Sequence, residues 1–132
     1  VEAVPAWRLW PVHDRPPLRG PHEMATGRVA LVGDAAHPMR PYLAQGAGMA
    51  IEDAAALQKV LAACDGRVLD VPTMLKRYAL ERWARCARVQ ARSRRNGWIF
   101  HARGPLRWGR NLAMQVGGEP LLDLPWLYGA AA

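Results

Sequence analysis

The chain has 132 residues, about half of them apolar, which is enough for the buried core of one modest domain. Its two cysteines lack a CxxC pair or a histidine at ligand spacing, which argues against a disulfide framework or a zinc site. No apolar run reaches the roughly 18 residues of a membrane span. These features and a formal net charge of +7 predict a cytoplasmic protein without a membrane segment.

The first 23 residues are rich in proline and tryptophan. Trp7 and Leu9 alternate with Arg8 and Trp10, which is the pattern of a short strand, and the prolines that follow predict an extended connector. The simplest interpretation makes the two tryptophans apolar anchors of an edge strand.

Residues 28–32 (RVALV) form a short apolar run that is typical of a strand buried on both faces. Gly33 ends this run. Asp34 then stands at the carboxyl end of the strand, where open α/β sheets bind their ligands. From the residues alone, Asp34 either caps a turn at residues 35–37 or accepts hydrogen bonds from a ligand's hydroxyls.

The next segment contains Pro38 and Pro41, which exclude a long helix, and then Gln-Gly-Ala-Gly at residues 45–48. We expect Gly46 to need a positive φ in this turn, and a helix to begin near Met49 with acidic residues 52 and 53 in its first turns. The free amides of residues 46–48 would then give the helix N-terminus a partial positive charge.

Helix breakers divide the rest of the chain. Asp70 and Pro72 predict the start of a long second helix, and Gly97 is a candidate break within it. The expected segments are a first helix ending near Gly66, a second from Thr73 to about Ala102, a third from Leu106 to about Val116, and an apolar tail from Leu121 to Tyr128 that must pack on another element.

Basic residues crowd the stretch between Pro72 and Arg110, where Glu81 is the single acid. A basic helix can follow a phosphate backbone, so this stretch is the best argument for a nucleic-acid partner. No zinc finger, helix-turn-helix or aromatic RNA-binding signature accompanies it. We therefore interpret the stretch as a solvated helix face and predict no nucleic-acid partner.

The run from Gly33 to Ala54, GDAAHPMRPYLAQGAGMAIEDA, resembles the second FAD-binding motif of the FAD-dependent aromatic-ring monooxygenases, most closely the salicylate-hydroxylase-like branch. Weaker similarity extends from about Trp7 to Gly129. Two residues depart from the pattern: the family often has Gly at the position of Ala44, and many members have Asn at that of Gly48. Neither change removes a backbone amide, so the departures bear on the placement of the flavin ring rather than on cofactor binding.

The resemblance implies an α/β fold class, here the C-terminal fragment of a Rossmann-like FAD-binding domain of the aromatic hydroxylase type, with one or two strands followed by three mainly helical segments. Residues 1–23 would be a connector or strand from the substrate domain, and residues 24–132 the C-terminal part of the FAD-binding domain. The GxGxxG unit that opens such proteins is absent from this chain. We expect a longer flavoprotein, with the substrate-activating base upstream of residue 1.

The resemblance also implies roles for particular residues. Asp34 would accept hydrogen bonds from the ribityl chain of FAD, and the helix that follows would stabilise the anionic edge of the reduced ring. Pro41 would hold the loop against the flavin face, and His37 is more often a structural hydrogen-bonder than a base. The expected cofactor-binding residues are Gly33, Asp34, Gln45, Gly46, Ala47 and Gly48, with no metal ligand.

The implied function is hydroxylation of an aromatic acid or phenol, with FAD, NADH or NADPH as co-substrate, and O2 reacting through a flavin C4a-hydroperoxide. In that case Trp7 and Trp10 would lie near the substrate cavity. The alternatives are another FAD-dependent oxidation such as epoxidation, an inactive fragment, or a basic nucleic-acid-binding module.

Overall fold

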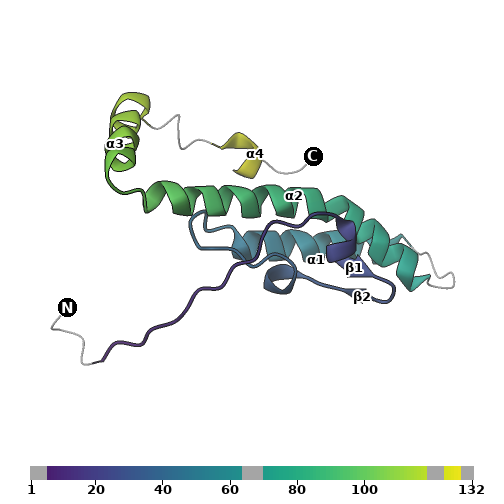
Figure 1. Cartoon of the computed structure of the whole chain (residues 1–132). Coiled ribbons are helices and arrows are strands. Elements are labelled where there is room, and N and C mark those ends of the chain that lie inside the picture. Colours follow the sequence, from purple (N-terminus) through teal and green to yellow (C-terminus); the bar gives the residue numbers. More distant parts are fainter. Residues whose placement is uncertain (1–5, 64–69, 119–123, 129–132) are drawn as a thin grey trace.

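Two long antiparallel helices form the body of the molecule (Figure 1). A computed structural model describes residues 6–63, 70–118 and 124–128. Helix α1 (Gly46–Ala62) packs along the first part of α2 (Val71–Phe100). The short helices η1 (Pro21–Glu23) and η2 (Gly33–Ala35) contact α2 and α1 respectively. The helices α3 (Pro105–Gly117) and α4 (Pro125–Tyr128) complete the chain.

Helix α2 begins where the sequence predicts. The Asp70 carboxylate accepts a hydrogen bond from the Thr73 amide at 3.4 Å, and Pro72 lies in the first turn, where its missing N–H costs nothing. The helix then continues to Phe100 without a break at Gly97. The predicted long helix is therefore confirmed, and the candidate break at Gly97 does not occur.

Helix α1 begins at Gly46, three residues before the expected start, and this moves its acidic residues. Glu52 and Asp53 lie in the second turn, and the first turn holds no acid. The expectation that they stabilise the helix N-terminus through the helix dipole was wrong, because that effect fades beyond the first turn. They face α2 instead.

The core lies between α1, α2 and the segments that cross them. Tyr78 is fully buried, and its hydroxyl donates to the Leu31 carbonyl oxygen at 3.0 Å, which ties α2 to the residues after β2. The other large apolar side chains that are buried here are Leu18, Met24, Leu43, Met49, Val60, Met74, Val89 and Leu127.

The strand expected over residues 28–32 is shorter and more exposed than predicted. Strand β2 (Val29–Ala30) pairs in antiparallel fashion with β1 (Ala25–Thr26) through a turn at Gly27, whose φ is +58°. Val29 is 66% exposed. Within the described residues, β1 is the only strand beside β2, so a run suited to burial on both faces has one neighbour and an open side.

The strand expected near Trp7 is also missing. Residues 6–13 extend away from the helices as an irregular, exposed segment, and both Trp7 and Trp10 are 72% exposed (Figure 1). Among the described residues no strand lies beside this segment, so its backbone has no partner for strand hydrogen bonds despite the alternating sequence. The tryptophans do not act as apolar anchors in this structure.

The third helix and the tail agree with the sequence. Helix α3 spans almost the predicted range and exposes Trp108, Leu112 and Val116. In the described part of the tail, Leu127 is buried against α2. The end expected for α1 at Gly66 lies outside the described residues. No helix in the described part of the chain combines the length and apolar character needed to cross a bilayer.

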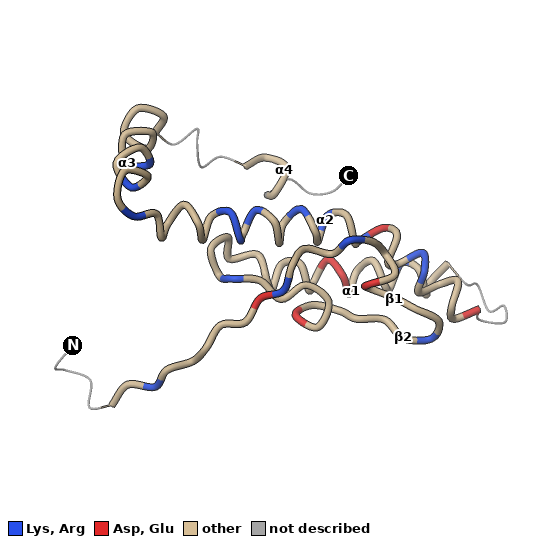
Figure 2. The backbone as a smooth tube through the Cα atoms, in the orientation of Figure 1, with Lys and Arg blue, Asp and Glu red and all other residues tan. Residues whose placement is uncertain are grey.

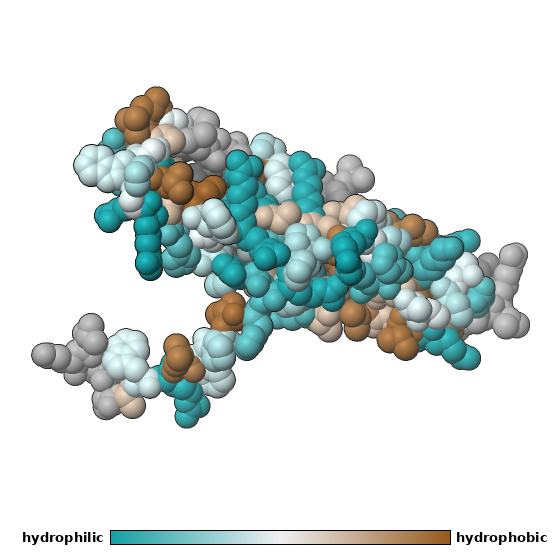
Figure 3. Space-filling model, viewed as in Figure 1, coloured by the Kyte–Doolittle hydropathy of each residue, from teal (hydrophilic) through white to brown (hydrophobic). Residues whose placement is uncertain are grey.

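The exposed apolar side chains generate a first prediction. Figure 3 shows brown apolar residues over α3 and along the N-terminal segment. Because these side chains form patches rather than single exposed residues, the isolated 132-residue chain should bind the dye ANS and self-associate. It should also hold FAD weakly, because this sequence lacks the GxGxxG unit that would bind the adenosine half of the cofactor. Dye fluorescence, size-exclusion chromatography and flavin stoichiometry measure the three effects.

The control is a Trp108→Gln, Leu112→Gln variant, which removes two apolar side chains that the rest of the chain does not bury and should lower dye binding without unfolding α2. A monomer that ignores the dye and carries one tightly bound FAD would contradict the prediction.

Candidate functional site

A turn after β2 places a carboxylate at the N-terminus of α1. Gly33 has a φ of +59°, which favours glycine, and a Cβ on it would lie 3.3 Å from that of Ala50. The next residue, Asp34, is exposed. A Cβ on Gly46 would lie 3.9 Å from Asp34 Oδ1, with no other atom within 4 Å. The structure therefore brings Asp34 and the start of α1 together, as expected from the sequence.

The first turn of α1 leaves backbone donors available. The first intrahelical hydrogen bond runs from the Met49 amide to the Gln45 carbonyl at 2.8 Å, so the amides of residues 46–48 precede the hydrogen-bonded ladder. The Gln45 side chain makes no capping hydrogen bond. These amides and the positive end of the helix dipole can face an anionic group.

The expected backbone of this turn needs a correction. Gly46 and Gly48 do not adopt positive φ, because both already lie within α1. The left-handed residue is Ala44, with a φ of 52°, directly before the helix N-cap. The chain reverses at Ala44, so Gly46 has no conformational need of its own and its missing side chain leaves space beside Asp34.

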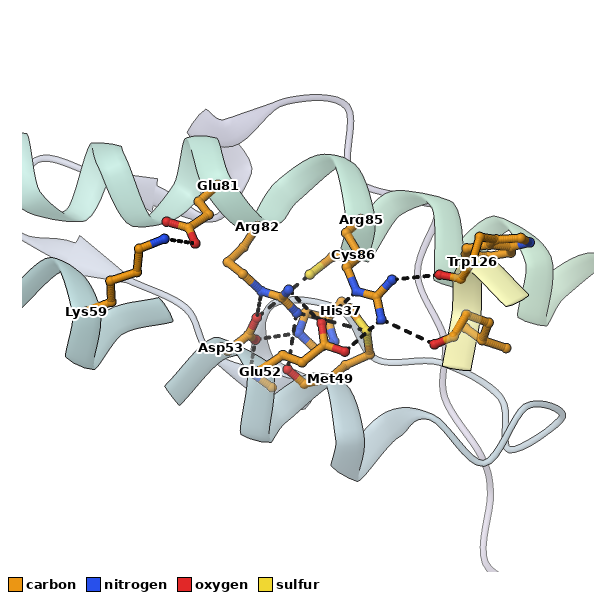
Figure 4. A network of polar contacts seen from close by, with 12 residues as sticks. His37, Met49, Glu52, Asp53, Lys59, Glu81, Arg82, Arg85, Cys86 and Trp126 are labelled. Carbon is orange, nitrogen blue, oxygen red and sulfur yellow. Dashed lines mark hydrogen bonds and ion pairs between the residues drawn. The ribbon is translucent and has the colours of Figure 1, made fainter. Parts of the chain in front are cut away.

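A buried ion network holds this arrangement (Figure 4). Asp53 on α1 is fully buried. Its Oδ2 accepts from the Gly33 amide at 3.0 Å and from His37 Nε2 at 2.6 Å, and its Oδ1 accepts from Arg82 Nε at 2.8 Å. One carboxylate thus joins the η2 turn, α1 and α2.

A second carboxylate extends the network toward α4. Glu52 pairs with Arg82 at 2.7 Å and with Arg85 at 2.6 Å. Arg85 also donates to the carbonyl oxygens of Trp126 at 3.0 Å and Leu127 at 3.3 Å. The two arginines therefore hold α1 on α2, and Arg85 also holds residues 126 and 127 of the tail.

The electrostatics follow from these contacts. Burial alone would raise the pKa of Asp53, but hydrogen bonds from His37, Arg82 and the Gly33 amide outweigh it and hold the pKa below its ordinary value of 3.8. The hydrogen bond from Arg85 is the largest cause that lowers the pKa of Glu52. Both acids stay ionised at neutral pH, which balances the two arginines.

His37 acts here as a structural hydrogen-bonder. It is fully buried, its Nε2 donates to the ionised Asp53 carboxylate, and its Nδ1 has no hydrogen-bond partner among the described residues. Cys86 lies in the same cluster, where burial raises the pKa of its thiol to about 12. The Asp53 carboxylate already accepts hydrogen bonds from three protein donors, which gives this cluster a structural role in the described chain.

Sequence reasoning missed Arg82 and Arg85. It grouped them with the basic residues of a solvated helix face, yet Arg82 is 5% exposed. Figure 2 shows basic residues in the middle of α2 beside the acidic residues of α1. The available signal was a pair of adjacent acids on one helix and two arginines three residues apart on the next.

Comparison with known proteins agrees with this geometry. The sequence profile described as "FAD binding domain" matches residues 10–93. The chain belongs to the FAD binding domain family. A 3-hydroxybenzoate 6-hydroxylase of Aquipseudomonas alcaligenes is 46% identical over 93% of the chain, and a 3-amino-4-hydroxybenzoate 2-monooxygenase of Streptomyces platensis is 44% identical over 93%. A 6-hydroxynicotinate 3-monooxygenase of Bordetella bronchiseptica is 40% identical over 93%. The chain spans 30% of the length of each of these relatives.

The family membership confirms the resemblance and the FAD cofactor expected from the sequence. It also confirms the fold class as part of an FAD-binding domain, and the FAD-binding chain contains the short strands followed by helices that the sequence predicts. The site residues fit the cofactor, because an exposed carboxylate stands beside amides that precede the helical ladder.

The buried network generates a second prediction. Asp53→Asn removes the charge opposite Arg82 but nearly preserves side-chain volume. Because Arg82 keeps Glu52 as a partner, we expect a loss of about 3 kcal/mol in the free energy of unfolding, at the low end for a broken buried pair. Urea denaturation of both proteins at pH 7 measures it.

The matched control is Glu81→Gln, which breaks the exposed Lys59–Glu81 pair on the same two helices and should cost less than about 1 kcal/mol. The pKa of Asp53 is lower in the folded protein than in the unfolded chain. Asp53 therefore stabilises the fold fully at pH values above its ordinary pKa, and this stabilisation is lost as the pH falls through the lower pKa of the folded protein. The unfolding free energies of the unsubstituted protein and Asp53→Asn should therefore converge below about pH 4. A constant difference down to pH 2 would contradict this assignment.

Proposed function

We propose that the chain forms the flavin-contacting, C-terminal part of a monooxygenase that hydroxylates an aromatic acid or phenol, with FAD, O2 and NADH or NADPH. The observation that carries the proposal is the exposed Asp34 carboxylate beside the α1 amides of residues 46–48. When bound, FAD supplies the oxygen chemistry. The chain's own residues bind and orient it.

Each expected site residue has a distinct task in this proposal. The Asp34 carboxylate accepts hydrogen bonds from hydroxyls of the ribityl chain, and Gly33 lets that chain pass close to the backbone. The amides of Gly46, Ala47 and Gly48 stabilise negative charge on the reduced ring, with Gln45 as the helix N-cap. Pro41 stiffens the loop that lies against the flavin face.

The substrate class follows from the relatives. Their names give a hydroxybenzoate, an aminohydroxybenzoate and a hydroxynicotinate as substrates, which are all small aromatic carboxylates with a ring hydroxyl. We infer that the substrate here belongs to this class. A cytoplasmic location, where reduced nicotinamides are available, remains part of the same proposal.

Four arginines of the basic stretch make contacts within the chain. Within the described residues, Arg82 and Arg85 bind acids of α1, Arg88 lies 4.0 Å from the Trp126 ring centre, and Arg94 pairs with Asp14. These arginines serve internal contacts. Contacts within the chain account for these four arginines, and we propose a small aromatic substrate rather than a nucleic acid as the partner.

The proposal predicts that Asp34→Ala weakens FAD binding in the complete gene product that contains this chain. Loss of a charged acceptor for ribityl hydroxyls should raise the dissociation constant roughly tenfold to hundredfold, which is about 1.5–3 kcal/mol. Quenching of flavin fluorescence on titration measures it.

The control is Asp70→Ala, which removes another exposed carboxylate at the start of α2 and should lower stability without changing FAD affinity. Equal dissociation constants for the Asp34→Ala and unsubstituted proteins would reject the role of Asp34.

The proposal also predicts that Gly46→Val separates folding from flavin binding. Apart from the helix's own backbone, a Cβ at this position has only Asp34 Oδ1 within 4 Å, so this chain has room for a β-carbon there. The new methyl groups would fill the space over the α1 amides and lower flavin occupancy while the melting temperature stays nearly unchanged. Absorbance ratios of the purified protein and a thermal scan give the two quantities.

Gly109→Val is the matched control, because Gly109 is helical and has nothing within 4 Å of its Cβ position. That variant should keep full flavin content. A Gly46→Val protein with full flavin content would show that Gly46 is only a tolerated helix residue.

A further inference from the structure

One face of α2 follows the loop that contains Pro41. Gln90, Ser93 and Gly97 recur at spacings of three and four and are buried, so they lie on one stripe of the helix. Ser93 Oγ donates to the Arg40 carbonyl oxygen at 2.7 Å, and Gln90 Nε2 donates to the Pro38 carbonyl oxygen at 3.4 Å. Side chains of the helix thus bind the backbone of the loop, and these hydrogen bonds do not depend on the loop's side chains.

Gly97 makes the closest contact of the stripe. A Cβ at this position would lie 2.6 Å from Tyr42 Cε2 and 3.3 Å from Tyr42 Cδ2, so the Tyr42 ring rests on the bare helix backbone. The Tyr42 hydroxyl lies 2.7 Å from His101 Nε2, and its ring centre is 5.6 Å from that of Phe100. Glycine is unfavourable inside a helix, and the ring contact explains its presence here.

Pro41 lies between the two residues that the stripe holds. The Tyr42 amide donates to the Arg40 carbonyl oxygen at 2.9 Å, which closes a three-residue turn centred on Pro41. The fixed φ of proline suits this turn. Arg40 also forms an ion pair with Asp14 at 3.0 Å. The position of Pro41 is therefore determined by contacts on both of its neighbours.

We propose that Ser93 and Gly97 are positioning residues of the flavin site, which act through Arg40 and Tyr42 to fix the Pro41 turn. The inference rests on the proposed function, because that function places the Pro41 segment against the flavin face. Neither residue touches the cofactor. Gly97 accommodates the Tyr42 ring. Ser93 donates to the Arg40 carbonyl oxygen, which also accepts the hydrogen bond from the Tyr42 amide that closes the turn.

The test uses Gly97→Ala in the complete gene product that contains this chain, with FAD dissociation constant, flavin reduction potential and melting temperature as readouts. The added methyl group must displace the Tyr42 ring and with it the turn. We expect roughly tenfold weaker FAD binding and a shifted reduction potential, since sites of this kind tolerate displacements of only about 0.5 Å. A purely structural role would lower the melting temperature without moving the potential of the bound flavin.

Two further variants isolate the contact. Gly109→Ala makes the same exchange in α3. Apart from the helix's own backbone, no described atom lies within 4 Å of the Cβ position of Gly109, so this variant should leave FAD binding and the reduction potential unchanged. In a Tyr42→Ala background the clash partner is gone, so adding Gly97→Ala should change neither quantity further. If Gly97→Ala fails to fold, Ser93→Ala carries the test, because it deletes one hydroxyl and adds no bulk.

The outcomes separate the two proposals. An unsubstituted protein that binds no FAD overturns the proposed function, and this inference with it. If that protein binds FAD while Gly97→Ala and Ser93→Ala retain its dissociation constant and reduction potential, the inference alone is overturned. Persistence of the full Gly97→Ala effect in the Tyr42→Ala background also overturns it, because the effect would then not pass through the ring.

Discussion

The ion pair between Asp53 and Arg82 is the interaction on which the rest of the structure depends. Both side chains are withdrawn from water, and a charge in that position is tolerated only when partners satisfy it. Asp53 meets this condition through three donors, of which Gly33 and His37 belong to the η2 turn and its exit and Arg82 to α2. Loss of any one element leaves a buried charge incompletely satisfied, so the network couples the η2 turn to both long helices.

This coupling explains how a buried network can control an exposed site. The amide of Gly33 donates to Asp53, and the residue that follows it is Asp34. Fixing that amide fixes where the chain leaves the strand, and the left-handed backbone of Gly33 then directs Asp34 toward the α1 N-terminus. The positive charge that Arg82 brings is neutralised inside the network. Arg82 therefore pairs with Asp53 and Glu52 and not with the exposed Asp34.

Local sequence signals predicted those features that depend on neighbouring residues in the chain. Asp70 and Pro72 define the start of α2 because capping is decided within one helical turn. Asp34 and the small residues after Gln45 lie in one continuous motif, and the structure places Asp34 beside Gly46. The range of α3 follows from the glycines and the proline at its ends.

Features that depend on distant partners could not be predicted in the same way. The sequence shows that residues 28–32 suit a buried strand but not which strands lie beside them, and Val29 is exposed in the chain as described. Arg82 and the exposed Arg95 have the same chemistry and lie on the same helix. What distinguishes them is the position of Asp53, twenty-nine residues before Arg82. Only the packing of α1 on α2 decides which arginine is buried.

The loop between η2 and α1 shows how these constraints meet. It is held by Asp53 at its start, through His37, and by α2 in its middle, through Ser93 and Gly97. The chain must then turn into α1 within a few residues, and Ala44 does so with a left-handed φ of 52°, at a cost of about 1–2 kcal/mol for a residue with a Cβ. Strain of this kind persists because the contacts on both sides over-determine the path. Since α2 binds both Asp53, through Arg82, and the Pro41 turn, one helix sets the start and the middle of the loop relative to each other. The position of the turn relative to Asp34 is consequently a property of α2, which makes that helix as important to the site as the motif itself.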